Sequence, residues 1–207
     1  MITLFIDTSS KDVSIAILKD KKVISSISKS IPNQHSIHTV SFIDTVIKES
    51  NLLPNDIEKI MVVTGPGSFT GVRIGVTIAK TYAYLKNIPI IEVSSLKMRS
   101  LSLEHQYCLS LIDAHHNNYY IGLYNKENEE VINEQFASRE KVLEIINTYQ
   151  PTIIADEDLT IEEHAVHKQQ LDLEAIHLYY QEKIATNPHL VVPNYLKLPQ
   201  ALEEKHD

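Results

Sequence analysis

Four of the five glycines in this chain fall within eleven residues, GPGSFTGVRIG at positions 65–75. The apolar run Ile60–Val63 precedes them, and residues 76–85 follow without glycine or proline. Glycine permits positive φ and close approach of backbone, so the run predicts a strand, a tight turn and a helix. Ser68 or Thr70 can cap that helix, and the free amides at its start favour an anion.

Neither common nucleotide-binding motif is present in this turn. The phosphate loop needs a lysine followed by Ser or Thr, which is absent, and the dinucleotide fingerprint needs a third glycine where Thr70 stands. The central serine of a hydrolase nucleophile elbow is also missing. An anion site and a plain capped turn therefore remain alternatives.

The helix after the turn carries a ridge of small side chains. Gly71, Gly75, Ala79 and Ala83 recur every four residues and share one face, which lets a sheet or a helix approach closely. A different face is also apolar, so we expect burial on two sides. One side would pack on the chain's own sheet, and the other on a further helix of the fold or on a second protein. The second apolar face consists of Ile74, Ile78 and Leu85.

Composition excludes several classes of protein. No apolar run approaches the ~20 residues of a membrane span, and the N-terminus shows no signal-peptide pattern. The single cysteine, Cys108, fits a core position in a cytoplasmic protein. A net charge of −8 argues against direct binding of nucleic acid. A length of 207 residues allows one large or two small domains.

The pattern of elements repeats along the chain as β-β-β-α-β-α. We expect an N-terminal lobe at residues 1–103 and a reduced C-terminal lobe at 104–207, with a tail, 187–207, that could pack back. In the first lobe the expected strands are 3–6, 13–18, 23–27, 60–63 and 88–93, and the expected helices are 37 to about 51, 72–86 and 96–103. In the second lobe the expected strands are 107–112, 118–124, 130–136 and 152–155, and the expected helices 139–149 and 171–184.

Both copies open with a strand that ends in an aspartate, Asp7 and Asp113. Two such α/β lobes face to face form the ASKHA arrangement of actin, Hsp70 and the sugar kinases. There, Asp7-Thr8-Ser9 would hold a phosphate or a metal-bound water; the alternative is that these side chains satisfy the turn backbone. The second lobe is short and lacks a glycine-rich adenosine loop, which argues against an ATPase acting alone.

The histidines do not predict a metal site. His35 and His38 are three residues apart, but they fit better as the start of a helix capped by Ser36. No HExxH occurs, and no two histidines stand four apart. We expect His164 and His167 to face solvent.

Three segments together resemble the TsaB (YeaZ) family, which takes part in threonylcarbamoyl modification of the tRNA adenosine next to the anticodon. They are Asp7-Thr8-Ser9, His35-Ser36 and, above all, residues 65–75, whose motif is highly specific. Residues 193–197, PNYLK, are similar to the family's C-terminal pattern. The resemblance covers about the first hundred residues and this tail.

The resemblance implies an ASKHA fold and a non-catalytic subunit without a cofactor of its own. Family members are similar to the catalytic subunit TsaD but lack its pair of histidines four apart. They bind TsaD, or a second copy of themselves, through two helices, here about 38–50 and 72–86. A TsaE-like ATPase joins the complex, ATP or ADP can lie near the junction, and tRNA is reached only through the complex.

Two sets of site residues follow from the resemblance. The expected partner or dimer interface consists of His38, Phe42, Val46, Gly71, Arg73, Gly75, Ala79, Tyr82 and Ala83. The expected nucleotide-proximal motif consists of Asp7, Thr8, Ser9, Gly65, Pro66, Gly67, Ser68 and Thr70.

One turn departs from the family, which carries an Arg and a Gly where His115-His116-Asn117-Asn118 stands here. The rival functions are a glycoprotease-like metallopeptidase, a two-lobed ATPase, and a protein that only self-associates. A stoichiometric metal or free-standing ATP turnover would favour the enzymes. From the sequence alone, Ala79→Glu is expected to break partner binding and leave the fold intact.

Overall fold

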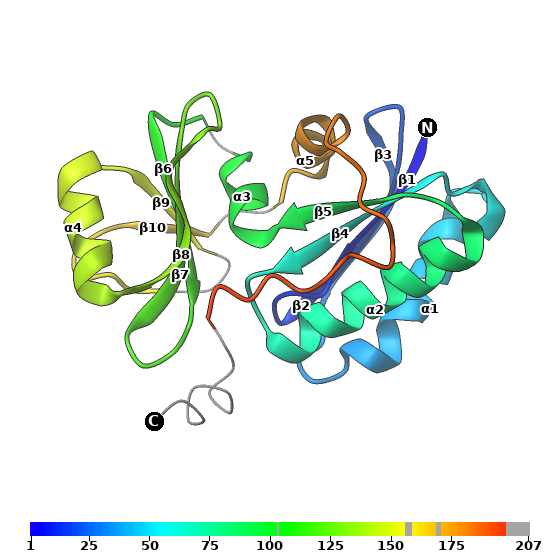
Figure 1. The fold of residues 1–207 in the computed structure, drawn as a ribbon, viewed down its shortest axis with the longest axis horizontal. Coiled ribbons are helices and arrows are strands. Elements are labelled where there is room, and N and C mark those ends of the chain that lie inside the picture. Colours follow the sequence, from blue (N-terminus) through cyan, green and yellow to red (C-terminus); the bar gives the residue numbers. More distant parts are fainter. Residues whose placement is uncertain (103, 156–158, 169–170, 198–207) are drawn as a thin grey trace.

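The computed structural model describes residues 1–102, 104–155, 159–168 and 171–197. It contains two lobes, each built on a five-stranded sheet (Figure 1). The first lobe consists of β1 (Ile2–Asp7), β2 (Asp12–Lys19), β3 (Lys22–Ser30), α1 (His35–Glu49), the short 3-10 helix η1 (Pro54–Asp56), β4 (Lys59–Gly65), α2 (Phe69–Lys86), β5 (Ile90–Ser94) and α3 (Ser95–Ser100). The second consists of β6 (Tyr107–Asp113), β7 (Asn118–Asn125), β8 (Glu130–Ser138), α4 (Arg139–Tyr149), β9 (Thr152–Ala155) and β10 (Val166–Lys168), followed by α5 (Leu173–Tyr180).

The two sheets have the same topology. The first runs β3-β2-β1-β4-β5, and the second, taken from its other edge, runs β8-β7-β6-β9-β10. In each, an antiparallel meander of three strands is extended by two parallel strands. The duplicated α/β fold is therefore confirmed. The second copy is reduced because α2 joins β4 to β5, whereas residues 159–165, the described part of the link from β9 to β10, contain no helix.

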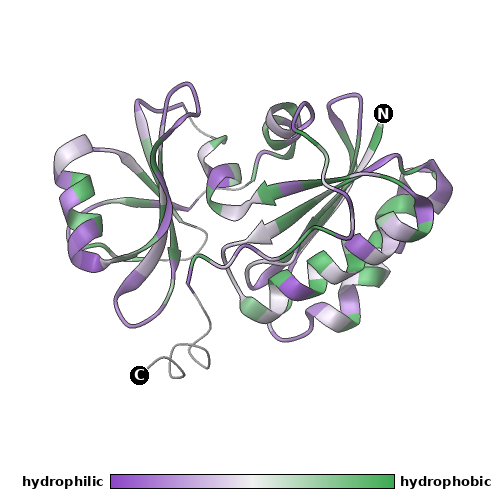
Figure 2. Ribbon diagram, viewed as in Figure 1, coloured by the Kyte–Doolittle hydropathy of each residue, from purple (hydrophilic) through white to green (hydrophobic). Residues whose placement is uncertain are grey.

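The strands of the first sheet are largely hydrophobic (Figure 2), and their buried side chains form two separate clusters. On one face, α1 and α2 lie side by side and bury Ile6, Ile15 and Val62 (Figure 1). Burial of such side chains contributes about 1.5–3 kcal/mol each. The second lobe has its own core between its sheet and α4. None of the described helices has the length and apolar character needed to cross a bilayer.

The helix expected over residues 171–184 in the second lobe is corrected in both length and place. α5 ends at Tyr180, because no apolar side chain follows at helical spacing until Ile184, which is 94% exposed. Ile176 and Tyr180 pack with Phe5 of β1 on the other face of the first sheet. By its contacts, α5 therefore belongs to the first lobe.

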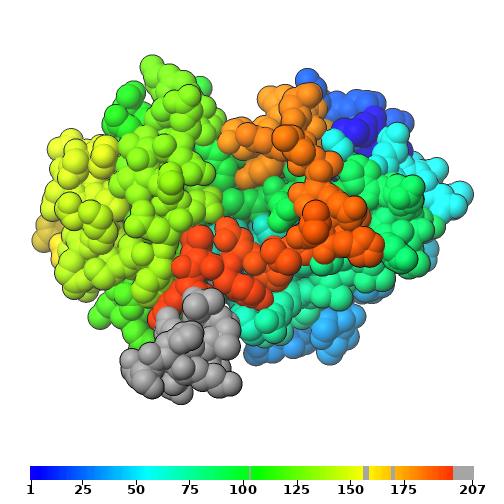
Figure 3. Space-filling view, in the orientation of Figure 1, coloured from blue at the N-terminus to red at the C-terminus, as the bar shows by residue number. Residues whose placement is uncertain are grey.

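The segment after α5, residues 184–197, crosses the first lobe, and we call it the C-terminal strap. It appears in orange to red across the face of the molecule in Figure 3. The Thr186 amide donates to the Ile90 carbonyl at 2.7 Å, and the Asn194 amide donates to the Thr64 carbonyl at 2.7 Å. Val191 is fully buried in the core of the first lobe. Residues 198–207 of the expected tail lie outside the described residues.

A partly buried polar cluster joins the lobes. The hydroxyls of Ser94 on β5 and Tyr124 on β7 both donate to the Glu134 carboxylate on β8, the second at 2.8 Å. Burial raises the pKa of Glu134, although these two hydrogen bonds oppose the rise. Lys97 of α3 donates to the Asn128 carbonyl and stands 4.0 Å from the Tyr124 ring centroid; burial lowers the pKa of Lys97 to about 8.

Glu134→Gln is expected to change how stability depends on pH. The folded protein holds the Glu134 proton more tightly than the unfolded chain, so its contribution to stability is largest below the ordinary carboxyl pKa. That contribution is lost as the pH rises through the raised value. The glutamine at this position does not titrate, so the variant does not lose this contribution. Its free energy of unfolding should therefore rise relative to that of the wild type as the pH increases. Urea unfolding between pH 4 and 8 measures the difference, and a constant difference would contradict the prediction.

Candidate functional site

The glycine turn between β4 and α2 lies directly on the loop that follows β1. Gly65 has a φ of +111°, and a Cβ added to Gly67 would lie 2.3 Å from the Ser9 carbonyl oxygen. The Ser68 amide donates to that same oxygen at 2.7 Å. Ser68 also caps α2, because its hydroxyl accepts from the Gly71 amide at 3.2 Å. The expected tight turn is confirmed, with Ser68 rather than Thr70 as the cap.

The Asp7 and Thr8 side chains of the first loop are engaged within the chain, whereas the buried Ser9 hydroxyl has no hydrogen-bond partner among the described residues. The Asp7 carboxylate accepts from the Ser9 amide at 2.8 Å, and the Thr8 hydroxyl donates to the Gly71 carbonyl at 2.7 Å. All three residues are at most 4% exposed. These contacts support the alternative in which the loop satisfies its own turn. Asp7 also borders a cavity of about 540 Å³ together with Asp12 and Arg99, and nucleotide binding near Asp7 stays a prediction.

The small-residue ridge of α2 faces its own lobe, which corrects the expected interface. A Cβ would lie 2.1 Å from the Thr8 carbonyl oxygen at Gly71 and 2.4 Å from the Thr8 hydroxyl at Gly75. Ala79 and Ala83 are fully buried. The ridge exists because α2 passes so close to the end of β1, and its side chains are not available to a partner. Val46 of α1 is likewise 0% exposed in the core, so it does not belong to the expected interface.

The outer surface of α1 and α2 carries an exposed apolar groove, which we call the α1–α2 groove. Val40 is 59% exposed and Phe69 42%, and Ile37, which precedes Val40 by one turn of α1, is 69% exposed. The groove encloses about 450 Å³. Exposed apolar side chains gathered in this way are typical of surfaces that bind another protein, a ligand or a membrane. The groove is lined by Ser36, Val40, Phe69, Thr70, Arg73, Ile74, Thr77 and Ile78.

Sequence reasoning found only part of this groove. It placed Ile74 and Ile78 on a second apolar face of α2 and named Arg73 as an interface residue, but it missed Val40, Phe69 and Thr77. A signal for Val40 was present, because α1 has apolar residues at more positions than one face can bury.

The other expected interface residues lie on the outer sides of the same helices. The His38 and Phe42 rings stack, with centroids 5.7 Å apart, and the Lys29 ammonium lies 5.6 Å from the Phe42 ring centroid. Tyr82 is half-buried, and its hydroxyl donates to the Pro54 carbonyl at 2.7 Å. Their role in partner binding stays a prediction.

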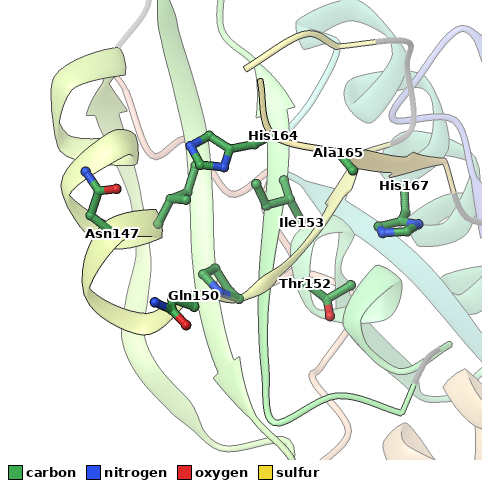
Figure 4. Close-up of a pocket in the computed structure, with 9 residues that line it drawn as sticks. Asn147, Gln150, Thr152, Ile153, His164, Ala165 and His167 are labelled. Atoms are coloured by element: carbon green, nitrogen blue, oxygen red, sulfur yellow. The ribbon is translucent and has the colours of Figure 1, made fainter. Parts of the chain in front are cut away.

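The histidines lie in separate parts of the molecule. His35 is buried and bonds the Ser10 carbonyl through Nε2 at 2.8 Å; α1 begins at His35, so the expected cap at Ser36 is wrong. His164 and His167 are exposed, as expected, and line a hollow beside the end of α4. Their rings do not converge (Figure 4). Across the part of the chain that the structure describes, no three His, Cys, Asp or Glu side chains are grouped to hold a metal.

The turn at His115 and His116 is exposed and tightly wound. His115, His116 and Asn117 all have positive φ, between 54° and 64°. The His115 amide donates to the Asp113 carboxylate at 2.8 Å. Asp113 therefore stabilises its own turn, much as Asp7 does in the first lobe.

Comparison with known proteins places the chain among tRNA-modification proteins. The family model of TsaD, tRNA N6-adenosine threonylcarbamoyltransferase, matches residues 22–203. The tRNA threonylcarbamoyladenosine biosynthesis protein TsaB of Bacillus subtilis is 32% identical over 97% of this chain and 96% of its own length. The transferase of Fusobacterium nucleatum is 34% identical over 64% of this chain, but over only 45% of its own length. YeaZ from Pseudomonas aeruginosa superimposes with a TM-score of 0.79 at 21% identity and covers 94% of this chain and 99% of its own.

Proposed function

Given that the chain belongs to the TsaB (YeaZ) family of tRNA threonylcarbamoyladenosine biosynthesis proteins, we propose that it is a non-catalytic subunit that binds and activates a TsaD-like catalytic subunit. A role in this tRNA modification follows from the family. Binding the catalytic subunit is the step that we argue from the groove.

The α1–α2 groove is the observation that carries the proposal. A monomer gains nothing from exposing Val40 and Phe69 in one groove, with Ile37 exposed one turn before Val40, whereas burying them against a partner contributes roughly 25 cal/mol per Å² of apolar surface. The chain also matches the TsaD family model across both helices. A TsaD-like partner therefore has counterparts of α1 and α2, and two related helix pairs can pack face to face. In this proposal the bound chain favours the active arrangement of its partner.

The same groove serves a homodimer when the catalytic subunit is absent, so the two assemblies compete. The net charge of −8 supports an indirect role toward tRNA, which the other subunits would hold. A TsaE-like ATPase completes the proposed complex, with ATP or ADP near the junction, and the complex acts in the cytoplasm. The sequence supports a non-catalytic role. The family resemblance implies that TsaD carries a pair of histidines four residues apart, and no two of the ten histidines in this chain have that spacing.

Light scattering after size-exclusion chromatography tests the proposal with the TsaD-like subunit of the same organism. The expected result is a mixed complex that forms at the expense of the homodimer. A mixture in which both proteins elute as they do alone, at concentrations of tens of micromolar, would contradict it. Peptide cleavage or ATP turnover by the isolated chain would support a rival enzyme instead.

A further inference from the structure

The C-terminal strap reaches the end of the α1–α2 groove and fixes one side chain there. The Arg73 Nε donates to the Tyr195 hydroxyl at 2.7 Å. The guanidinium carbon lies 3.9 Å from the Phe69 ring centroid and 5.8 Å from that of Tyr195. The two rings are 5.3 Å apart and tilted by 33°. The Arg73 guanidinium is therefore held by a hydrogen bond at one edge and by aromatic rings against its flat face.

Tyr195 is itself held in a fixed place. The preceding residue, Asn194, bonds the end of β4 through its backbone amide, and Val191 is buried in the core. The Lys80 ammonium of α2 also donates to the Val191 carbonyl at 2.7 Å. Because the strap is anchored immediately before this contact, the Tyr195 hydroxyl holds the Arg73 side chain in place before a partner binds. Arg73 therefore loses less conformational entropy on binding.

The free edge of Arg73 has no acidic partner. Its Nε is occupied by Tyr195, but the two terminal nitrogens can still donate side by side, the geometry that matches a carboxylate. Across residues 1–102, 104–155, 159–168 and 171–197, no Asp or Glu forms an ion pair with Arg73. Arg73 is also the one charged residue among the eight that line the groove.

We propose that Arg73 binds a side-chain carboxylate of the TsaD-like subunit, and that Tyr195 is a positioning residue that makes the C-terminal strap part of the docking site. This inference rests on the proposed function. A single cation at the end of an apolar groove suits one acidic side chain on a partner helix. It suits tRNA less well, because the neighbouring groove residues are neutral and polyanion binding needs several cations.

The same feature favours the catalytic subunit over a second copy. In a symmetric dimer each groove meets the identical groove, and the residues that line it include no aspartate or glutamate. In such a dimer Arg73 would be buried and the facing groove would supply no carboxylate. Burying a charge without a partner costs free energy. A partner that supplies the carboxylate removes that cost.

Isothermal titration with the TsaD-like subunit, without tRNA and at 50, 150 and 500 mM NaCl, tests the inference. Arg73→Gln should weaken binding about 10- to 100-fold at 50 mM and flatten its salt dependence, because a hydrogen-bonded charge contact is lost. Arg73→Lys should recover only part of the lost affinity, since an ammonium cannot present the two parallel N–H donors of a guanidinium. The control, Lys141→Gln, removes the same charge from exposed α4 and should bind as the wild type does.

Tyr195→Phe keeps the ring and removes the hydroxyl, and it should weaken binding about 2- to 10-fold. In an Arg73→Gln background it should have no further effect, because Tyr195 acts through Arg73. Equal effects in both backgrounds would overturn the positioning role.

The outcomes separate this inference from the proposed function. If the wild type does not bind the TsaD-like subunit, the proposed function itself fails. If the wild type binds and Arg73→Gln matches it in affinity and salt dependence, only the carboxylate contact is wrong. If Arg73→Gln instead weakens only the binding of tRNA to the assembled complex, the ligand is a phosphate and the inference is overturned.

Discussion

Ala79→Glu is expected to unfold the first lobe. Ala79 is fully buried where α2 packs on its own sheet, so the new carboxylate would sit in the core without a partner. An uncompensated buried charge costs about 3–5 kcal/mol or more, a large part of the roughly 5–15 kcal/mol that stabilises a domain. Guanidinium unfolding followed by circular dichroism should show a much lower midpoint, or no folded protein.

Thr81→Glu is the matched control for this prediction. It introduces the same charge two residues further along α2, at an exposed position, and should unfold close to the wild type. Should Ala79→Glu keep the wild-type midpoint and lose only partner binding, as the sequence alone suggested, α2 would present its ridge outward. The groove would then be assigned to the wrong side of the helix.

Val40→Glu is expected to weaken binding of the TsaD-like subunit strongly while the protein stays folded. Val40 is 59% exposed and lines the α1–α2 groove from α1, so a carboxylate there stays hydrated in the free protein. In the complex it would be buried among apolar side chains. Losses of about 2–4 kcal/mol are typical of residues at the centre of an interface, which corresponds to a roughly 30- to 1,000-fold weaker complex by titration calorimetry.

Val131→Glu is the control for Val40→Glu, because it makes the same change at an exposed position on β8 in the second lobe. It should bind as the wild type does. Equal binding by Val40→Glu and the wild type would move the docking site away from the groove. Equal losses in both variants would point to a general effect of added negative charge.

Much of the fold is predictable because strong local signals coincide with tertiary contacts. The helix Arg139–Tyr149 and the strand Thr152–Ala155 match the sequence-based bounds. In α4, capping by Ser138 and inward apolar residues at helical spacing agree with each other. The three-strand meanders are equally clear, because alternation and turns mark both. The glycine turn was recognised for the same reason: few residues other than glycine fit where its backbone meets Ser9.

The site was less predictable because periodicity shows which residues share a face but not which face is inside. α2 has two apolar faces, and the one with the smaller side chains packs inward on Thr8. Only the position of the sheet decides this. β10 gave no signal, because it is three residues long and is held by backbone pairing with β9. The contact between Tyr195 and Arg73 spans 122 positions, and nothing local marks it.

The reconstituted reaction tests the central claim most directly. The TsaD-like and TsaE-like subunits of the same organism, threonylcarbamoyl-adenylate, ATP and tRNA are combined with and without this chain, and modified adenosine is measured. We predict modification that needs the wild-type chain, fails with Val40→Glu, and is absent when the chain is the only protein present. Equal modification without the chain would contradict its role as an activator.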